Sequence, residues 1–263
     1  MAPGRPAQMS QGSPDQHAGP ESLAGDCMIA LVLMLGVLQE PNTALQDIFN
    51  GKDLAGWVVE GPSKLKTGEP IWRVTSEGLL RATAGKDEFG GGGFGFLRYS
   101  VQKYSNFKLR VEYRFLPVSA EVESGNSGVG IRTVPFDRKQ NRTTRPSFAG
   151  YEIQLLDDAG KPANKGSSGS LYRYAAPKAN PVRAAPAWNC LEIECQGSRI
   201  KIVLNDTPIL DVDQNTLEDL PARNKPQGIP APKDKPLTGY LCLQSHSGTV
   251  EFRKVQVREL TVK

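Results

Sequence analysis

Apolar and polar residues alternate along many short segments of this chain. In GYEIQLLD, residues 150–157, three apolar side chains alternate with Glu152 and Gln154. Successive side chains of an extended strand point to opposite faces of a sheet. The pattern therefore predicts a strand with one face on a core, while its polar face meets either solvent or a ligand-binding cleft.

From residue 45 onward, similar segments follow one another between turns. The segments that predict strands are GWVVEG, IWRVTSEGLLRAT, FGFLRYS, FKLRVEYRFLP, GVGIRTV, GYEIQLLD, GSLYRYA, WNCLEIECQGSRIKIVLNDTPILDVD, GYLCLQSHSG and VEFRKVQVREL. Asn205-Asp206 predicts the tip of a hairpin, because both residue types tolerate left-handed backbone. Only LQDIFN and NTLEDL predict short helical turns. Many short strands with almost no helix are typical of an all-β sandwich or jelly roll, in which a concave sheet face is open to ligands.

Residues 1–44 differ in composition from the rest of the chain. The first 27 residues are rich in Pro, Gly, Ser and Gln without periodicity, which predicts disorder. Residues 28–38, MIALVLMLGVL, form an apolar run of signal-peptide length that is too short for a stable membrane span, and a cleavage site near Ala44 follows. We expect export to the periplasm or the cell exterior, which leaves one domain at residues 45–263. Because Arg5 is the one basic residue upstream, Met28 is an alternative start, and a buried strand or short helix is the alternative for 28–38.

The composition is ordinary for a globular protein, with 38% hydrophobic and 23% charged residues. The net charge of +4 is spread along the chain without a basic stripe, which argues against nucleic-acid binding. Cys190, Cys195 and Cys242 lie in apolar strands without CxxC spacing. We therefore expect them to pack as small buried hydrophobic residues rather than to form disulfides.

Several predicted strands carry polar residues that would share one sheet face if those strands were neighbours. These residues are Glu112, Arg114, Arg132, Glu192, Glu194, Gln244 and His246. The alternative is the solvated face of an antiparallel sheet, which the alternation also predicts. His246 is the sharpest candidate, because an imidazole has an ordinary pKa near 6.5 and transfers protons near neutrality; a hydrogen-bonded structural histidine is the alternative. No metal-binding spacing, nucleophile elbow or phosphate loop is present in the sequence.

Six motifs occur in the order found in a known family. They are DIFNGKDLAGW, GNSGVGIR, GYEIQLLDD, GSLYRYAAP, WNCLEIECQGSRIKIVLND and VEFRKVQVREL. Together they resemble the secreted bacterial 3-keto-disaccharide hydrolase family, also described as 3-keto-glucoside 1,2-lyases and hydratases. The resemblance runs from about residue 47 to the C-terminus and implies a concanavalin A-like jelly roll of two curved antiparallel sheets.

The resemblance also implies a substrate, namely a glycoside whose C3 hydroxyl a partner sugar 3-oxidoreductase has oxidised to a ketone. The ketone acidifies the C2 hydrogen, so a base can remove it, the C1 oxygen can leave, and water can add back. Such a route needs a base, a leaving-group acid and oxyanion donors. It does not need the two carboxylates at a fixed separation that hydrolysis through an oxocarbenium ion requires.

Roles for individual residues follow from the same resemblance. His246 or Glu152 would be the catalytic base, and the other would be the acid or an orienting group. Arg132 and Gln154 would hold the ketone oxygen and sugar hydroxyls, and Asn126 and Gln244 would add hydrogen bonds. Trp188 would stack on a sugar ring, with a place in the core as its alternative. A divalent ion bridging the substrate oxygens is an open possibility.

Two segments depart from the usual family pattern near the expected cleft, so substrate preference is not carried over. VSAEVESGNSG is expanded, and FDRKQNRTTRPSF lengthens the next loop with basic residues. The Pro- and Lys-rich stretch at 221–236 is either a functional rim or surface padding. The rival function is a non-catalytic carbohydrate-binding module of the cell envelope. Exposed aromatic rows favour that rival, whereas this chain has 7% aromatic residues and an ionisable predicted cleft.

Overall fold

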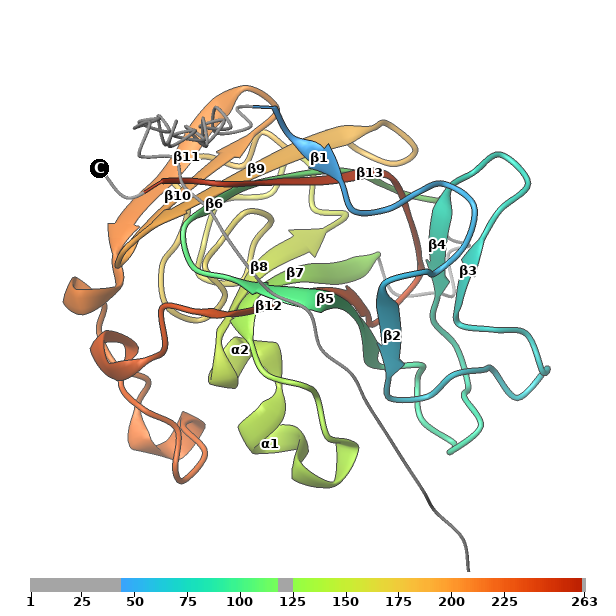
Figure 1. Ribbon diagram of the computed structural model, residues 1–263, viewed down its shortest axis with the longest axis horizontal. Coiled ribbons are helices and arrows are strands. Elements are labelled where there is room, and N and C mark those ends of the chain that lie inside the picture. Colours follow the sequence, from blue (N-terminus) through green and yellow to red (C-terminus); the bar gives the residue numbers. More distant parts are fainter. Residues whose placement is uncertain (1–43, 118–124, 262–263) are drawn as a thin grey trace, which may run out of the picture. The chain divides into compact units, whose positions relative to one another are not determined.

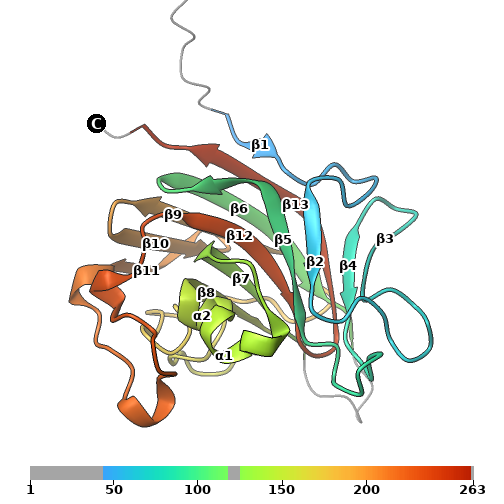
Figure 2. The ribbon, with the colours of Figure 1, turned by 60° about the horizontal axis from the view of Figure 1, so that its bottom comes forward.

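Two antiparallel β-sheets pack face to face in the computed structural model of the protein, as the strand pattern predicts (Figures 1 and 2). The structure describes residues 44–117 and 125–261. The predictions for the leader, the signal peptide and the apolar run at 28–38 lie outside the described residues. Within the described ranges, no helix is long and apolar enough to cross a membrane.

The first sheet has eight strands, all paired antiparallel. Their order is β11 (Thr207–Asp213), β10 (Arg199–Leu204), β9 (Asn189–Gln196), β6 (Phe107–Phe115), β13 (Thr249–Glu259), β4 (Leu80–Thr83) and β3 (Trp72–Val74), and β1 (Gln46–Asp47) also pairs with β13. The chain crosses repeatedly between the sheets, since β5 precedes β6, β8 precedes β9 and β12 precedes β13. This interleaving is the concanavalin A-like jelly roll that the sequence predicts.

The second sheet has five antiparallel strands and carries the candidate site on its outer face. Its order is β2 (Trp57–Glu60), β5 (Gly95–Tyr104), β12 (Gly239–Ser245), β7 (Asn126–Thr133) and β8 (Tyr151–Leu156). Two short helices, α1 (Asn141–Thr144) and α2 (Pro146–Ala149), lie on the side of this sheet that faces away from the eight-stranded sheet (Figures 1 and 2). In the described part of the chain, the connections contain four 3₁₀ helices: η1 (Arg138–Gln140), η2 (Gln214–Thr216), η3 (Ala222–Asn224) and η4 (Pro232–Asp234).

The core lies between the sheets and is made by the inward-facing residues of each alternating strand. In β8, Tyr151, Ile153 and Leu155 are fully buried in this core. Cys195 is also buried in it, Cys242 lies in a smaller buried cluster, and Cys190 is half-buried; all three are free thiols. The prediction that Cys195 and Cys242 pack as small apolar residues is therefore confirmed.

Several local predictions are tested by the structure. Asn205 and Asp206 both have positive φ, 48° and 64°, and form the turn between β10 and β11 as predicted. GSLYRYA is not a strand: Leu171 makes only isolated bridges, and Tyr172 to Tyr174 lie in turns. LQDIFN is not helical, because Gln46–Asp47 pairs with β13, whereas the predicted turn in NTLEDL corresponds in part to η2.

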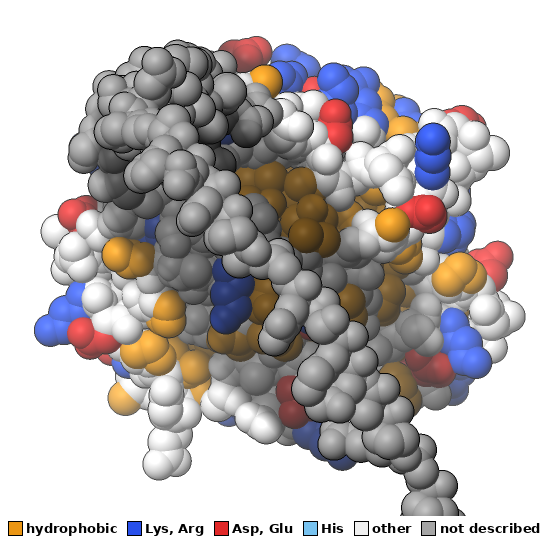
Figure 3. All heavy atoms as spheres, viewed as in Figure 1, with side chains coloured by type: hydrophobic (Ala, Val, Ile, Leu, Met, Phe, Trp, Pro, Cys, Tyr) orange, Lys and Arg blue, Asp and Glu red, His pale blue; other side chains and the backbone are white. Residues whose placement is uncertain are grey.

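Charges of both signs are interspersed on the molecular face shown in Figure 3. Many ion pairs occur on the outer face of the eight-stranded sheet, such as Lys108 with Glu192 and Lys201 with Glu194. The predicted shared polar face is therefore divided. Glu112, Arg114, Glu192 and Glu194 belong to the eight-stranded sheet, whereas Arg132 and Gln244 belong to the other and His246 directly follows its strand β12.

Candidate active site

Two glycines in β7 create space on the outer face of the five-stranded sheet. Gly128 pairs with Gln154 and Gly130 pairs with Glu152, so each glycine lies beside a polar residue of β8. A Cβ atom at Gly128 would lie 2.9 Å from Glu152 Oε1. The missing side chains let the carboxylate of Glu152 fold across β7 towards β12.

A small polar recess opens above these glycines. Its wall consists of Phe94, Asn126, Arg145, Glu152, Gln154, Tyr172, Gln244 and His246. Five of the seven residues predicted for the site lie here: Asn126, Glu152, Gln154, Gln244 and His246. The enclosed volume is only about 30 Å³, so a sugar would lie across the mouth and place its substituents inside.

Glu152 is the central ionisable group of the recess. Its side chain is buried, with 4% of the residue exposed, and its Oε1 accepts a hydrogen bond of 2.9 Å from Gln244 Nε2. Burial raises the pKa of Glu152 to about 7, although the Gln244 hydrogen bond and the positive charges of Arg145 and Arg173 oppose this rise. A carboxyl group with such a pKa exchanges protons readily near neutrality.

The mouth of the recess combines an imidazole with a guanidinium. His246 follows β12 directly and is exposed, and its ring meets Phe94 edge-on with centroids 5.2 Å apart. The Arg145 guanidinium lies 4.2 Å from the Phe94 ring centroid. Gln154 Nε2 lies 3.4 Å from Asn126 Oδ1, so two amides flank the carboxylate. Acid, base and hydrogen-bond donors thus converge on one small volume.

Arg132 does not line the recess, which corrects the role predicted for it. Simple alternation would place it on the outer face with Gly128 and Gly130. Instead, its φ is +53°, and the pairing of β7 with β12 shifts register at this point. Because the irregularity breaks the alternation, the side chain turns inward and is 1% exposed. There its Nη2 donates to the backbone oxygens of Ser105 and Gly197.

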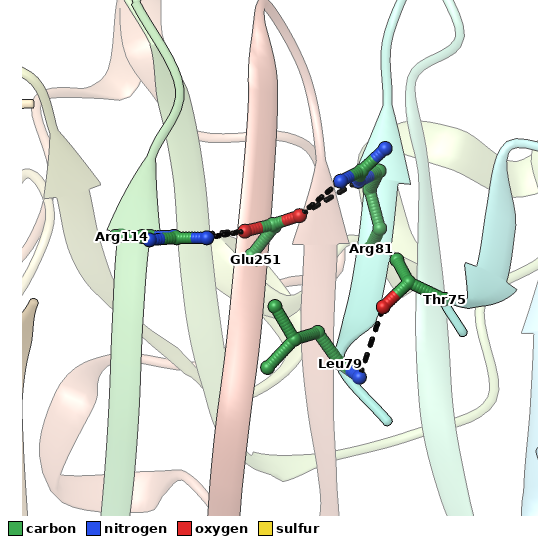
Figure 4. A network of polar contacts seen from close by, with 5 residues as sticks. All are labelled: Thr75, Leu79, Arg81, Arg114 and Glu251. Carbon is green, nitrogen blue, oxygen red and sulfur yellow. Dashed lines mark hydrogen bonds and ion pairs between the residues drawn. The ribbon is translucent and has the colours of Figure 1, made fainter. Parts of the chain in front are cut away.

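Trp188 does not line the recess either. Its ring lies between the guanidinium groups of Arg114 and Arg253, 4.6 Å and 4.5 Å from the ring centroid. Arg114 also pairs with the fully buried Glu251, which Arg81 contacts from the other side (Figure 4). Trp188 therefore belongs to a cation–π and ion-pair cluster on the eight-stranded sheet, and neither the sugar-stacking nor the core interpretation describes it.

The sequence interpretation missed three residues of the recess: Phe94, Arg145 and Tyr172. Phe94 and Tyr172 fell within the predicted strands FGFLRYS and GSLYRYA but were not singled out, and in the structure all three residues lie outside the named strands. The one available signal for Arg145 was the basic extension FDRKQNRTTRPSF, in which it precedes Pro146 at the start of α2. Arg145 lines the recess and supplies there the positive group that the sequence interpretation had expected from Arg132.

The donor set offers little for a metal ion. Among residues 44–117 and 125–261, no three His, Cys, Asp or Glu side chains lie close enough to hold one. The recess supplies one carboxylate, one imidazole and amide oxygens.

A larger cavity of about 510 Å³ lies between β1, β5 and the end of β13, but it contains none of the predicted site residues. The convergence of polar groups therefore favours the smaller recess.

Comparison with known proteins agrees with this architecture. The chain is similar to two crystal structures of a "putative glycosyl hydrolase" from Parabacteroides distasonis ATCC 8503. The first is 22% identical with a TM-score of 0.61 and covers 82% of this chain and 100% of that one. The second is 21% identical with a TM-score of 0.59 and covers 81% and 92%. At these identities the likeness establishes the shared fold. A search of curated protein sequences finds no match.

A family model gives the assignment. The model of the 3-keto-alpha-glucoside-1,2-lyase-like domain matches residues 44–258, most of the chain and nearly all of the described structure. The matched region includes β1 to β12, all of β13 except Glu259, and every residue of the recess. The family connects the domain with a carbohydrate-related, glycosidase-like activity. This protein belongs to the 3-keto-alpha-glucoside-1,2-lyase-like domain family.

Proposed function

We propose that this domain cleaves the glycosidic bond of 3-keto-glycosides by elimination followed by hydration. The observation that carries the proposal is Glu152, a buried carboxyl with a pKa of about 7 at the centre of a polar recess. Family membership supports the substrate class. An enzyme that removes a carbon-bound proton needs such a desolvated base, whereas a module that only binds sugar does not.

The chemistry begins at C2 of the oxidised sugar. The C3 ketone withdraws electrons from the neighbouring C2–H bond, so a base can take the proton and leave the electron pair as an enolate with its charge on O3. When the enolate collapses, the C3 carbonyl reforms, a C1–C2 double bond forms and the C1–O bond breaks. Addition of water across the new double bond gives the free 3-keto sugar, and the net reaction is hydrolysis.

Glu152 is assigned as the base. Its carboxylate is anchored by Gln244 and removed from solvent, which makes it a stronger base than an exposed glutamate. Once protonated, it can return the proton to C2 during hydration. One residue therefore serves both half-reactions without net consumption of protons.

Arg145 is assigned to the enolate oxygen. Its guanidinium lines the recess beside Glu152, and its Nε is buried without a hydrogen-bond partner. A fixed positive donor stabilises negative charge most effectively where that charge develops during the reaction. Gln154 and Asn126 are placed to bind sugar hydroxyls near the same wall.

His246 is assigned as the acid for the departing C1 oxygen. It lies at the exposed edge of the recess, where a leaving group of any size can reach solvent. Its imidazolium would give a proton to the leaving oxygen, and the neutral ring would then take one from the incoming water. The substrate itself must come from a sugar 3-oxidoreductase, because the unoxidised glycoside has no acidic C2 proton.

The test uses the purified protein with 3-keto-trehalose and the methyl 3-keto-α- and β-glucosides in D₂O, followed by NMR with and without a chelator. We expect deuterium at C2 of recovered or cleaved sugar, and release of the aglycone. The unoxidised sugars are the matched controls and should be inert. Glu152→Gln should still bind the substrates while losing exchange and cleavage together.

The opposite result would favour the carbohydrate-binding module. If folded protein binds the sugars but catalyses neither exchange nor cleavage, the enzyme assignment fails. Cleavage without C2 exchange, and unchanged in Glu152→Gln, would point to direct hydrolysis through other residues. Cleavage that stops on chelation would add a metal ion to the mechanism.

A further inference from the structure

A second cavity beside the recess is lined almost entirely by basic and amide side chains. Its volume is about 250 Å³, and its walls are Asn141, Arg142, Arg145, Phe148, Arg173, Arg223 and Asn224. We call this cavity the arginine pocket. It contains four guanidinium groups and no carboxylate.

The arginine pocket is built by three segments that are distant in sequence. One is the basic extension FDRKQNRTTRPSF with α1 and α2, another is the turn at 172–174, and the third is η3 in the excursion at 221–236. The basic extension and the Pro- and Lys-rich excursion, both noted in the sequence, therefore contribute walls to the same cavity. Four like charges from separate segments repel one another unless an anion offsets them.

Among the described residues, no carboxylate lines the arginine pocket. In the part of the chain that the structure describes, none of the four arginines forms an ion pair with a carboxylate. Two acidic residues just before the excursion pair with lysines, Asp219 with Lys225 and Glu218 with Lys165. Glu152 acts electrostatically on Arg145 and Arg173, but it lines the recess rather than the arginine pocket.

Two of the guanidinium groups are fixed in place with unused donors. The Nε atoms of Arg145 and Arg173 are buried and have no hydrogen-bond partner. The Arg173 guanidinium lies over the rings of Phe148 and Tyr172, at 4.6 Å and 5.0 Å from their centroids. Rigid guanidinium groups with free N–H donors suit an oxyanion, which can accept several such bonds at once.

The arginine pocket and the recess share Arg145, which lines both cavities. Tyr172 of the recess and Arg173 of the arginine pocket are also neighbours in the chain. If O3 of the sugar is at Arg145, C2 at Glu152 and C1 at His246, as assigned above, the C4 to C6 side of the ring is the side left for the arginine pocket, away from the bond that breaks.

We propose that the arginine pocket binds a carboxylate or sulfate group on the C4–C6 side of the sugar, so that the preferred substrates are acidic 3-keto-glycosides such as uronosides. The orientation of the sugar rests on the proposed function, whereas anion binding rests on the arginine pocket alone. Bidentate contacts from Arg142 and Arg223 at the open rim would complete the site.

Binding is measured first, because it does not depend on turnover. Calorimetry would compare methyl glucuronide with methyl glucuronamide, a neutral isostere, and with methyl glucoside 6-sulfate and free sulfate. We expect the uronide or the sulfated glucoside to bind about tenfold or more tightly than the uronamide. Equal affinity of uronide and uronamide, with no gain for the sulfated sugar, would overturn the proposal. So would free sulfate that binds as tightly as the acidic sugars.

Three matched variants test whether the preference for acidic sugars depends on the arginine pocket. Arg142→Gln and Arg223→Gln remove exposed walls of the arginine pocket and should each reduce the acidic-sugar preference severalfold. Arg138→Gln removes the same charge from the same loop, but this exposed arginine lies over Phe89 and outside the arginine pocket. Arg138→Gln should keep the preference for acidic sugars. An equal loss in this variant would mean that the preference arises from long-range charge rather than from the arginine pocket.

Turnover separates the two proposals. If 3-keto-uronosides and neutral 3-keto-glycosides are all inert while the uronide still binds selectively, the proposed reaction fails and the arginine pocket stands. If neutral 3-keto-glycosides are cleaved and the uronide shows no preference in either assay, the reaction stands and the arginine pocket assignment fails.

Discussion

Gln244 Nε2 donates a 2.9 Å hydrogen bond to Glu152 Oε1, across a strand that has glycines where side chains would otherwise stand. This bond joins β12 to β8 over the intervening strand β7. It fixes the carboxyl at the floor of the recess, where burial raises the pKa of Glu152 to about 7 although the hydrogen bond itself lowers it. Substitutions of Glu152, Gln244 and Gly128 test whether this arrangement serves catalysis.

Glu152→Gln should lower kcat and, at alkaline pH, raise the free energy of unfolding relative to the parent protein. The folded pKa of about 7 lies above the ordinary value of 4.5, so folding favours the protonated form. The stabilising contribution is complete below pH 4.5 and is lost as pH rises through 7, a change of about 3 kcal/mol. The free energy of unfolding of the variant, relative to the parent, should therefore rise by about that amount between pH 4 and pH 8.

Urea denaturation at the two pH values measures this difference, and kcat for a 3-keto-glycoside is measured on the same samples. We expect kcat to fall by about 10²- to 10⁴-fold, as for other lost general bases. If the variant loses activity but shows no pH-dependent gain in stability, burial does not raise the pKa of Glu152 in the folded protein. The desolvated-base assignment would then be wrong.

Gln244→Met should move the acidic limb of the pH–rate profile upward. Only the ionised form of Glu152 can accept a proton, so kcat/KM should rise with pH around a midpoint near 7. The Gln244 hydrogen bond stabilises the anion, and its removal should raise the midpoint by roughly one pH unit. A profile whose midpoint is the same in parent and variant would assign the limb to another group.

Gly128→Ala should impair catalysis more than folding. The new methyl group would lie 2.9 Å from Glu152 Oε1, so the carboxylate must move away from its hydrogen-bonded position. A fall in kcat of about tenfold or more is expected, because small displacements of a catalytic group are costly. Gly92→Ala is the matched control, since its methyl group would meet no atom within 4 Å. Equal kcat in the two variants would contradict the assigned position of the base.

Alternation in the sequence was sufficient to place Glu152 and Gln154 on one face, and the structure puts them in the recess with Asn126, Gln244 and His246. It failed at Arg132, because one left-handed residue reversed the direction of the side chain. Position along a strand therefore predicts a face only while the register is regular.

The remaining residues of the site could not be predicted from strand patterns. Arg145 and Tyr172 come from a helix boundary and a turn, where long-range packing decides the position of each side chain. The split of polar residues between two sheets was also hidden, because alternation shows that a strand has a polar face but not which sheet the strand joins. The concanavalin A-like form of the jelly roll was implied by the family resemblance rather than by the strand pattern.

Trp188→Leu should lower stability and leave catalysis intact. The indole lies between Arg114 and Arg253, and Arg114 extends to Glu251, a fully buried carboxylate that Arg81 also contacts (Figure 4). Loss of two cation–π contacts on a partly buried surface should cost about 1–2 kcal/mol of unfolding free energy. Because this cluster is on the other sheet from the recess, kcat/KM for a 3-keto-glycoside should stay within about twofold of the parent. A rise in KM of tenfold with unchanged stability would return Trp188 to the sugar-binding role that its sequence context suggested.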